Sequence, residues 1–90
     1  MNVRILGRAE ADLNRIEEHI EIDNPAAART TIRRIRKRCL DLADFPHQGR
    51  PAGASLRELV IAGTPYLAVY RVVGDEVRVL RILHGRQRRS

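Results

Sequence analysis

Residues 23–44 read DNPAAARTTIRRIRKRCLDLAD, and this stretch both starts a helix and fixes the face that it buries. Asn24 is a favoured N-cap and Pro25 suits the first helical position, so a helix is expected from Pro25 to Ala43 or Asp44. Apolar residues recur along it at intervals of four and three, which predicts one buried stripe. The stripe consists of Ala28, Ile32, Ile35, Cys39 and Leu42. The thiol of Cys39 is therefore predicted to be buried.

Upstream of this stretch, residues 9–22 (AEADLNRIEEHIEI) predict another helix. Leu13, Ile16 and Ile20 are spaced as i, i+3 and i+7, one face of a 3.6-residue period. Only a short connection precedes Pro25, so the two helices are predicted to form an antiparallel hairpin. Before them, residues 2–6 (NVRIL) predict a short strand that ends at Gly7 and Arg8.

Downstream, residues 45–55 (FPHQGRPAGAS) hold two Pro and two Gly and predict a loop. The apolar period then changes from 3.6 to 2, which is typical of strands. Three strands are expected, at residues 56–62, 66–73 and 76–83, the last two joined by a tight Gly74–Asp75 turn. The last strand is apolar on both faces near Leu80 to Leu83, which predicts cover on both sides.

This order of elements predicts a single α+β domain over residues 1–90. An N-terminal strand, an antiparallel helical hairpin and a three-stranded antiparallel meander follow one another along the chain. The hairpin is expected to cover one face of the sheet, and the N-terminal strand to pair with one of the later three. The 43% hydrophobic content excludes a disordered chain.

Composition narrows the cellular setting and the kind of chemistry. No apolar run approaches the ~20 residues of a membrane span, and the N-terminus does not resemble a signal peptide. A single cysteine cannot form an internal disulfide, which favours the cytoplasm. The three histidines, His19, His47 and His84, lack the spacing of metal ligands, so no metal site is expected.

The charge points to an anionic partner. Seventeen basic residues against eleven acidic ones give a formal charge of +6, and only one of the seventeen is Lys. Residues 29–38 carry six basic groups and no acid, whereas residues 10–23 carry six acids. These two stretches can pair across the hairpin, or the basic one can contact phosphate or an acidic protein.

The C-terminal strand end is the other basic cluster. Its members are Arg81, His84, Arg86, Arg88 and Arg89. A His beside several Arg can perform general acid–base work on a phosphodiester, although a solvated tail has the same composition. Tyr66 and Tyr70 lie four apart on one strand and therefore share a face, which favours core packing over stacking on a base.

Taken in order, the segments AEADLNRIEEHI, DNPAAA, FPHQGRP, LRELVI, PYLAVYRV and VRVLRILHGR resemble the RelE/ParE toxin superfamily, on its ParE side. The resemblance covers residues 9–86. It implies a toxin of a type II toxin–antitoxin system, with the helical hairpin on an antiparallel sheet. It also implies no cofactor, and a hetero-oligomeric complex with an acidic antitoxin encoded by the adjacent gene.

The family divides by target. RelE-like members cut mRNA on the ribosome without a metal, whereas ParE-like members are described as poisons of DNA gyrase. This sequence has Glu58 and Val60 where the nucleases tend to carry lysines, and Leu67 where they carry an arginine. His84 is followed by Gly85, and the tail has no tyrosine. The resemblance therefore implies gyrase inhibition by binding, without catalytic residues, and leaves the ribosome-dependent endonuclease as the alternative.

Two sets of site residues follow from the resemblance. Those expected to bind the target are Arg57, Arg81, His84, Arg86 and Arg88. In the nuclease alternative, His84 is the acid–base group, with Arg57, Arg81 and Arg86 on phosphate. Those expected to bind the antitoxin are Leu13, Ile16, Ile20, Arg33, Arg36, Tyr66 and Tyr70.

Overall fold

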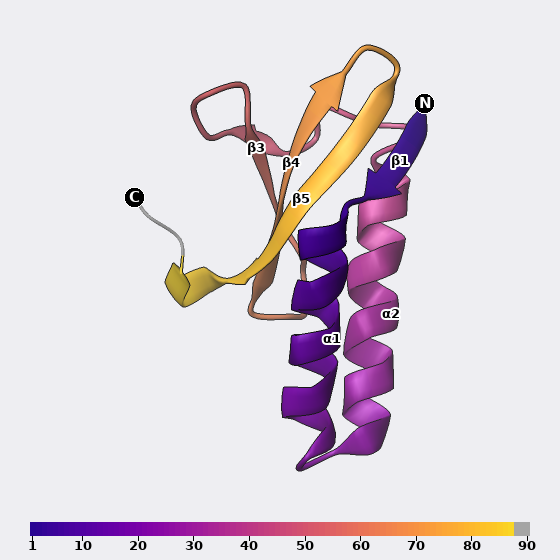
Figure 1. Cartoon of the computed structure of the whole chain (residues 1–90), viewed down its shortest axis with the longest axis vertical. Helices are drawn as coiled ribbons and strands as arrows, with labels where there is room; N and C mark the ends of the chain where they lie inside the picture. Colours follow the sequence, from indigo (N-terminus) through magenta and orange to yellow (C-terminus); the bar gives the residue numbers. More distant parts are fainter. Residues whose placement is uncertain (88–90) are drawn as a thin grey trace.

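The computed structural model describes residues 1–87, and Figure 1 shows how its helices and sheet are arranged. In chain order the elements are β1 (Asn2–Ile5), α1 (Gly7–Glu21), α2 (Pro25–Asp41), β2 (Arg50–Pro51), β3 (Arg57–Val60), β4 (Tyr66–Val73), β5 (Glu76–His84) and the 3-10 turn η1 (Gly85–Gln87). This succession confirms the predicted α+β fold, with one more strand than the sequence indicated.

Helix α2 follows the prediction closely. The Asn24 side chain accepts a hydrogen bond from the Ala27 amide at 3.0 Å, and Pro25 occupies the first helical position. All five members of the predicted stripe are buried, Ile35 and Cys39 completely. Regular helix ends at Asp41, slightly earlier than expected, and turns carry the chain on to the loop.

Helix α1 begins at Gly7, two residues before the predicted start. The chain is still extended at Leu6, whose carbonyl accepts a hydrogen bond from the Glu10 amide at 2.9 Å. No side chain caps this end, so no residue at this position signals the start of a helix. Glu10 and Arg36 form a bidentate pair at 2.7 and 3.1 Å, which confirms that the acidic and basic stretches pair across the hairpin.

The sheet has five strands in the order β1-β5-β4-β3-β2. The N-terminal strand pairs with β5 in parallel, whereas the other pairs are antiparallel. Strand β2 was missed because it has only two residues inside a loop rich in Pro and Gly. The predicted turn after β4 is present, with Gly74 in the left-handed region at φ +61°.

A β-bulge in β5 explains its apolar run. Val69 of β4 pairs with Arg81, but the next residue, Tyr70, pairs with Val79, so Leu80 is an extra residue. The bulge breaks the in–out alternation, and Leu80 and Leu83 remain half-buried. The expectation that this strand is covered on both sides is therefore wrong.

The helices cover one face of the sheet, where α1 packs against both α2 and β5. Below this contact the hairpin extends past the sheet, and its turn projects freely (Figure 1). Core residues from the sheet include Ala68, Tyr70, Val77, Val79 and Ile82. The opposite face, which we call the outer face, carries Arg4, Arg71 and Arg78 in one cross-strand row.

Candidate functional site

A groove lies where α1 crosses the C-terminal half of β5, beyond the end of β1. We call it the α1–β5 groove, and its volume is about 210 Å³. It is lined by Asp12, Arg15, Ile16, His19, Tyr66, Arg81, Ile82, His84 and Gln87. These residues come from both ends of the chain, since the fold brings the first helix against the last strand.

Asp12 organises the groove. Its carboxylate is only 2% exposed and accepts hydrogen bonds from Arg81 Nε at 2.8 Å and from the Ile82 amide at 2.8 Å. A second Arg81 nitrogen donates at 3.1 Å, and Arg15 on the next turn of α1 also donates to it. Beyond Ile5, no strand among residues 1–87 pairs with this edge of β5, so the Asp12 carboxylate accepts the hydrogen bond that a strand carbonyl would accept.

Hydrogen bonds and pairing with arginine together lower the pKa of Asp12 by more than burial raises it. Burial alone raises the pKa of this carboxyl, but the hydrogen bonds from Arg81, from the Ile82 amide and from Arg15 bring the pKa below its ordinary value. The same pairing raises the pKa of Arg81. The carboxylate is thus charged at neutral pH, and the Arg81 guanidinium is committed to it.

His84 lies at the far end of the groove. Its ring meets the Tyr66 ring edge-on, with centroids 5.5 Å apart and an interplanar angle of 79°. The Nδ1 atom accepts a hydrogen bond from the Arg86 amide at 3.1 Å, so the neutral ring carries its proton on Nε2. The His84 amide donates to the Gln87 side chain at 2.8 Å.

Arg57 is remote from this groove and holds a loop. It donates to the carbonyls of His47 at 3.2 Å and Gly49 at 2.6 Å. In the sheet Arg57 pairs with Tyr70 and His84 pairs with Tyr66, so four residues of β4, roughly 13 Å, separate them. The residues proposed for a nuclease therefore do not converge on one point.

The residues expected to bind an antitoxin occupy different environments. Ile16 and Tyr66 line the α1–β5 groove, and Arg33 is exposed on α2. Leu13 and Tyr70 are buried in the core, at 1% and 0% exposure, and offer no surface; in this respect the expectation was wrong.

The other expected site residues are placed as follows. Ile20 packs against the edge of the core, and Arg36 is held by Glu10. Arg86 lies in η1 beside His84, and Arg88 lies outside the described residues.

Sequence reasoning missed part of this groove. Asp12, Arg15, Ile16 and His19 recur at i, i+3, i+4 and i+7, so they form one face of α1. A place near the start of the predicted helix, where the helix dipole favours negative charge, already accounts for an acid at position 12 without any pairing. The helical spacing was the available signal, but only the fold shows that the last strand faces it.

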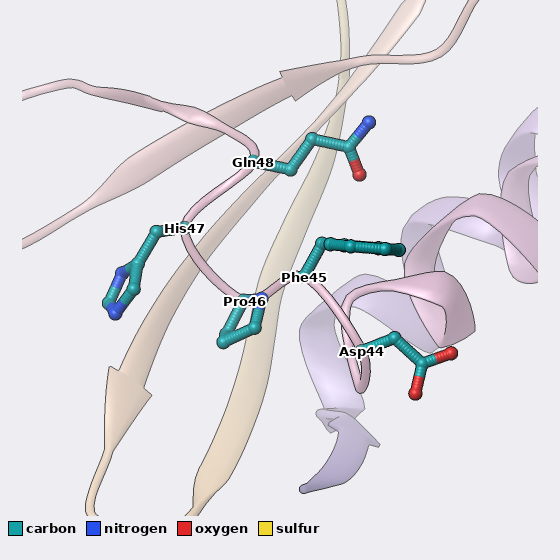
Figure 2. Close-up of a pocket in the computed structure, with 5 residues that line it drawn as sticks. All are labelled: Asp44, Phe45, Pro46, His47 and Gln48. Atoms are coloured by element: carbon teal, nitrogen blue, oxygen red, sulfur yellow. The ribbon is translucent and has the colours of Figure 1, made fainter.

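A second hollow, of about 560 Å³, is formed by the loop after α2 (Figure 2). It is lined by Asp44, Phe45, Pro46, His47 and Gln48. Phe45 is 66% exposed, and Figure 2 shows its ring and the His47 ring on different sides of the loop. This loop is fixed by Tyr70, whose hydroxyl accepts from the Gly49 amide and donates to the Pro46 carbonyl, both at 2.8 Å. The hollow offers apolar contact area rather than reacting groups.

Within residues 1–87, no set of three or more His, Cys, Asp or Glu side chains is arranged to hold a metal ion. Neither helix of the described chain is long and apolar enough to cross a membrane.

Comparison with known proteins places this chain in a family. The family described as ParE toxin of the type II toxin–antitoxin system parDE matches residues 3–89. Among curated relatives, the protein Y4kP of Sinorhizobium fredii is 41% identical over 81 residues, covering 89% of this chain and 83% of its own. Toxin RelE2 of Caulobacter vibrioides is 40% identical over 78 residues, covering 87% and 88%.

A solved structure extends the likeness to three dimensions. A chain from the chromosomal ParDE toxin–antitoxin system of P. aeruginosa superposes with a TM-score of 0.87 at 30% identity. The match covers 93% of this chain and 95% of that one. The relatives bear both RelE and ParE names, so the comparison fixes the family without choosing a cellular target. The chain belongs to the ParE family of toxins of type II toxin–antitoxin systems.

Proposed function

We propose that this toxin acts by binding DNA gyrase and trapping its cleaved complex, and that it does not cut RNA. The observation that carries the proposal is the row Val60–Leu67–Leu83, which the strand register places side by side on the outer face. The resemblance puts nuclease cations at Val60 and Leu67, and at Glu58 nearby. An apolar row beside a carboxylate cannot stabilise the developing negative charge of a cleaved phosphodiester.

The remaining cations support the same choice. Arg81 is engaged by Asp12, and Arg57 is engaged by two loop carbonyls. Each guanidinium would have to leave its partner before it could contact a phosphate. Arg81 and His84 line the same groove, but with Arg81 paired to Asp12 only one His and the neighbouring Arg86 are left for phosphoryl chemistry, which needs more electrostatic stabilisation.

Toxins of this family have an antitoxin partner, and the α1–β5 groove is where we propose that it binds. Ile16, Tyr66 and Ile82 supply apolar contact, while Arg15 and His84 supply positive or donor groups. An amphipathic acidic segment complements that lining and the overall charge of +6. Because residues expected to bind target and antitoxin share this groove, the antitoxin would act in the cytoplasm by direct competition.

The test is a gyrase supercoiling assay with purified toxin, with and without the product of the adjacent gene. We expect linear DNA to accumulate, and the partner to prevent it. His84→Ala should lower the amount of linear DNA only partly. Normal supercoiling together with cleavage of ribosome-bound mRNA that His84→Ala abolishes would instead establish the nuclease.

The antitoxin site has its own matched pair of variants. Ile16→Ala removes apolar area from the groove, whereas Ile22→Ala removes the same area from the hairpin turn, where Ile22 is 81% exposed. Isothermal titration with the antitoxin should show a loss of affinity of about tenfold or more for the first and little change for the second. Equal antitoxin affinities of the two variants would place the antitoxin outside the α1–β5 groove.

A further inference from the structure

The outer face of the sheet carries an arrangement that the proposed function does not use. Arg4 of β1, Arg78 of β5 and Arg71 of β4 are direct cross-strand neighbours and form one row. Like charges directly opposite each other destabilise a sheet. A row of three guanidiniums therefore has a cost that the fold must offset.

Only part of that cost is offset within the molecule. Glu76 accepts from Arg78 at 2.7 Å and from Arg4 at 3.4 Å, so these two cations share one carboxylate. Arg71 takes part in none of the ion pairs among residues 1–87. Its Nε atom is buried and has no hydrogen-bond partner in the described chain. A buried donor without an acceptor is rare in folded proteins.

Arg71 forms one wall of a groove. This groove, which we call the outer groove, has a volume of about 500 Å³. It is lined by Leu6, Gly7, Arg8, Leu56, Val69, Arg71, Leu80 and Arg81. None of these is acidic, and of the three lining arginines Arg81 is the one paired with Asp12. The bulge adds to the groove, since it leaves the extra residue Leu80 among the lining residues.

We propose that the outer groove binds an acidic, partly apolar peptide segment of a partner protein. A carboxylate of the segment accepts from Arg71, and from Arg8 at the rim, while an apolar side chain packs on Leu56, Val69 and Leu80. Carboxylates match the planar guanidinium fork, and hydrogen bonds between charged partners are the strong ones. A groove of this size has room for a few side chains.

The lining favours a peptide over a nucleic acid. A phosphate backbone needs exposed cations along a track, whereas here the unsatisfied donor is buried and the floor is aliphatic. The outer groove shares Arg81 with the α1–β5 groove but contains none of its apolar residues. The inference therefore does not depend on gyrase being the target.

The probe is a short fluorescein-labelled peptide in which Glu and Leu alternate, followed by fluorescence anisotropy with the full chain. We expect saturable binding that Arg71→Gln weakens by about tenfold or more. Arg29→Gln, the same charge change on the exposed face of α2, should weaken it by less than about twofold. A peptide alternating Glu and Gly should bind more weakly than the Glu–Leu peptide, since it cannot use the apolar floor. Thermal melts confirm that both variants are folded.

Four results would overturn the proposal. They are no binding of the peptide, equal losses for the two variants, equal binding of the Glu–Gly peptide, and preferential binding of a single-stranded oligonucleotide that depends on Arg71. Amide shifts on titration provide a second readout, because they should centre on Leu56, Val69 and Leu80. Shifts centred on the α1–β5 groove would contradict the assignment.

Discussion

Replacing Asp12 by alanine tests whether one buried carboxylate holds the last strand to the first helix. The substitution orphans the Ile82 amide and leaves Arg81 without its partner. Breaking a buried ion pair costs about 3–5 kcal/mol, and an unsatisfied buried amide about 1–3 kcal/mol. The Arg81 side chain is 28% exposed, so water recovers part of this loss. We expect a destabilisation of about 2–4 kcal/mol.

Urea unfolding followed by circular dichroism measures this loss. With a slope of about 1.5 kcal/mol per molar, the midpoint should fall by roughly 2 M. Glu10→Ala is the control, because the Glu10–Arg36 pair is about two-fifths exposed on both sides and is expected to contribute at most about 1 kcal/mol. If the two midpoints moved by the same amount, Asp12 would be an ordinary surface acid and our account of the groove would fail.

The contribution of Asp12 to stability depends on pH with a defined sign. The pKa of Asp12 lies below its ordinary value of 3.8, so its stabilisation is present above that value and is lost as pH falls through the folded-state pKa. Asp12→Asn cannot titrate. The stability gap between wild type and this variant should therefore be constant near pH 6 and narrow as the pH falls below 3.8. A gap that widened in acid would contradict the charged state that we assign.

Further expectations concern the loop after α2 and the core. Gly49→Ala places a Cβ 2.7 Å from the Tyr70 hydroxyl and 2.8 Å from the Glu58 carbonyl, and should cost about 1–3 kcal/mol by urea unfolding. Gly7→Ala is the control, because the space around its Cβ is open, and it should be neutral or stabilising. A larger loss of stability for Gly7→Ala than for Gly49→Ala would refute the close contact at Gly49. Tyr70→Phe leaves the Gly49 amide unsatisfied, so amide exchange there should rise and stability fall by about 1–2 kcal/mol; unchanged exchange would exclude the bond. Burial raises the pKa of Cys39 to about 11, so a thiol reagent at neutral pH should label it only after unfolding; rapid labelling of native protein would contradict its burial.

Local patterns sufficed for the helical hairpin and the order of strands. Asn24 and Pro25 set the start of α2 through backbone chemistry within four residues, and the stripe through Ile32 and Cys39 follows from helix geometry alone. Such features depend on neighbours in sequence, so the sequence displays them.

Long-range pairing was not predictable in the same way. Asp12 and Arg81 are separated by 69 positions, and neither one alone signals that it is paired. The bulge at Leu80 and the pairing of β1 with β5 likewise depend on how distant segments meet. The resemblance named Arg81 and His84, which both line the α1–β5 groove, but it did not separate buried Leu13 and Tyr70 from surface residues. Exposure is a property of the packed chain.

The hydrogen bonds that Asp12 and Gln87 form with β5 also bear on self-association. Past the end of β1, the amides of Ile82 and His84 would be open donors on a strand edge, the usual template for edge-to-edge aggregation. Side chains occupy both donors, and the opposite edge of the sheet ends in the two-residue β2, where Pro51 has no amide hydrogen to offer. Both edges of the sheet are thereby protected against pairing with another chain. A newly made toxin can therefore avoid aggregation while its partner is still absent.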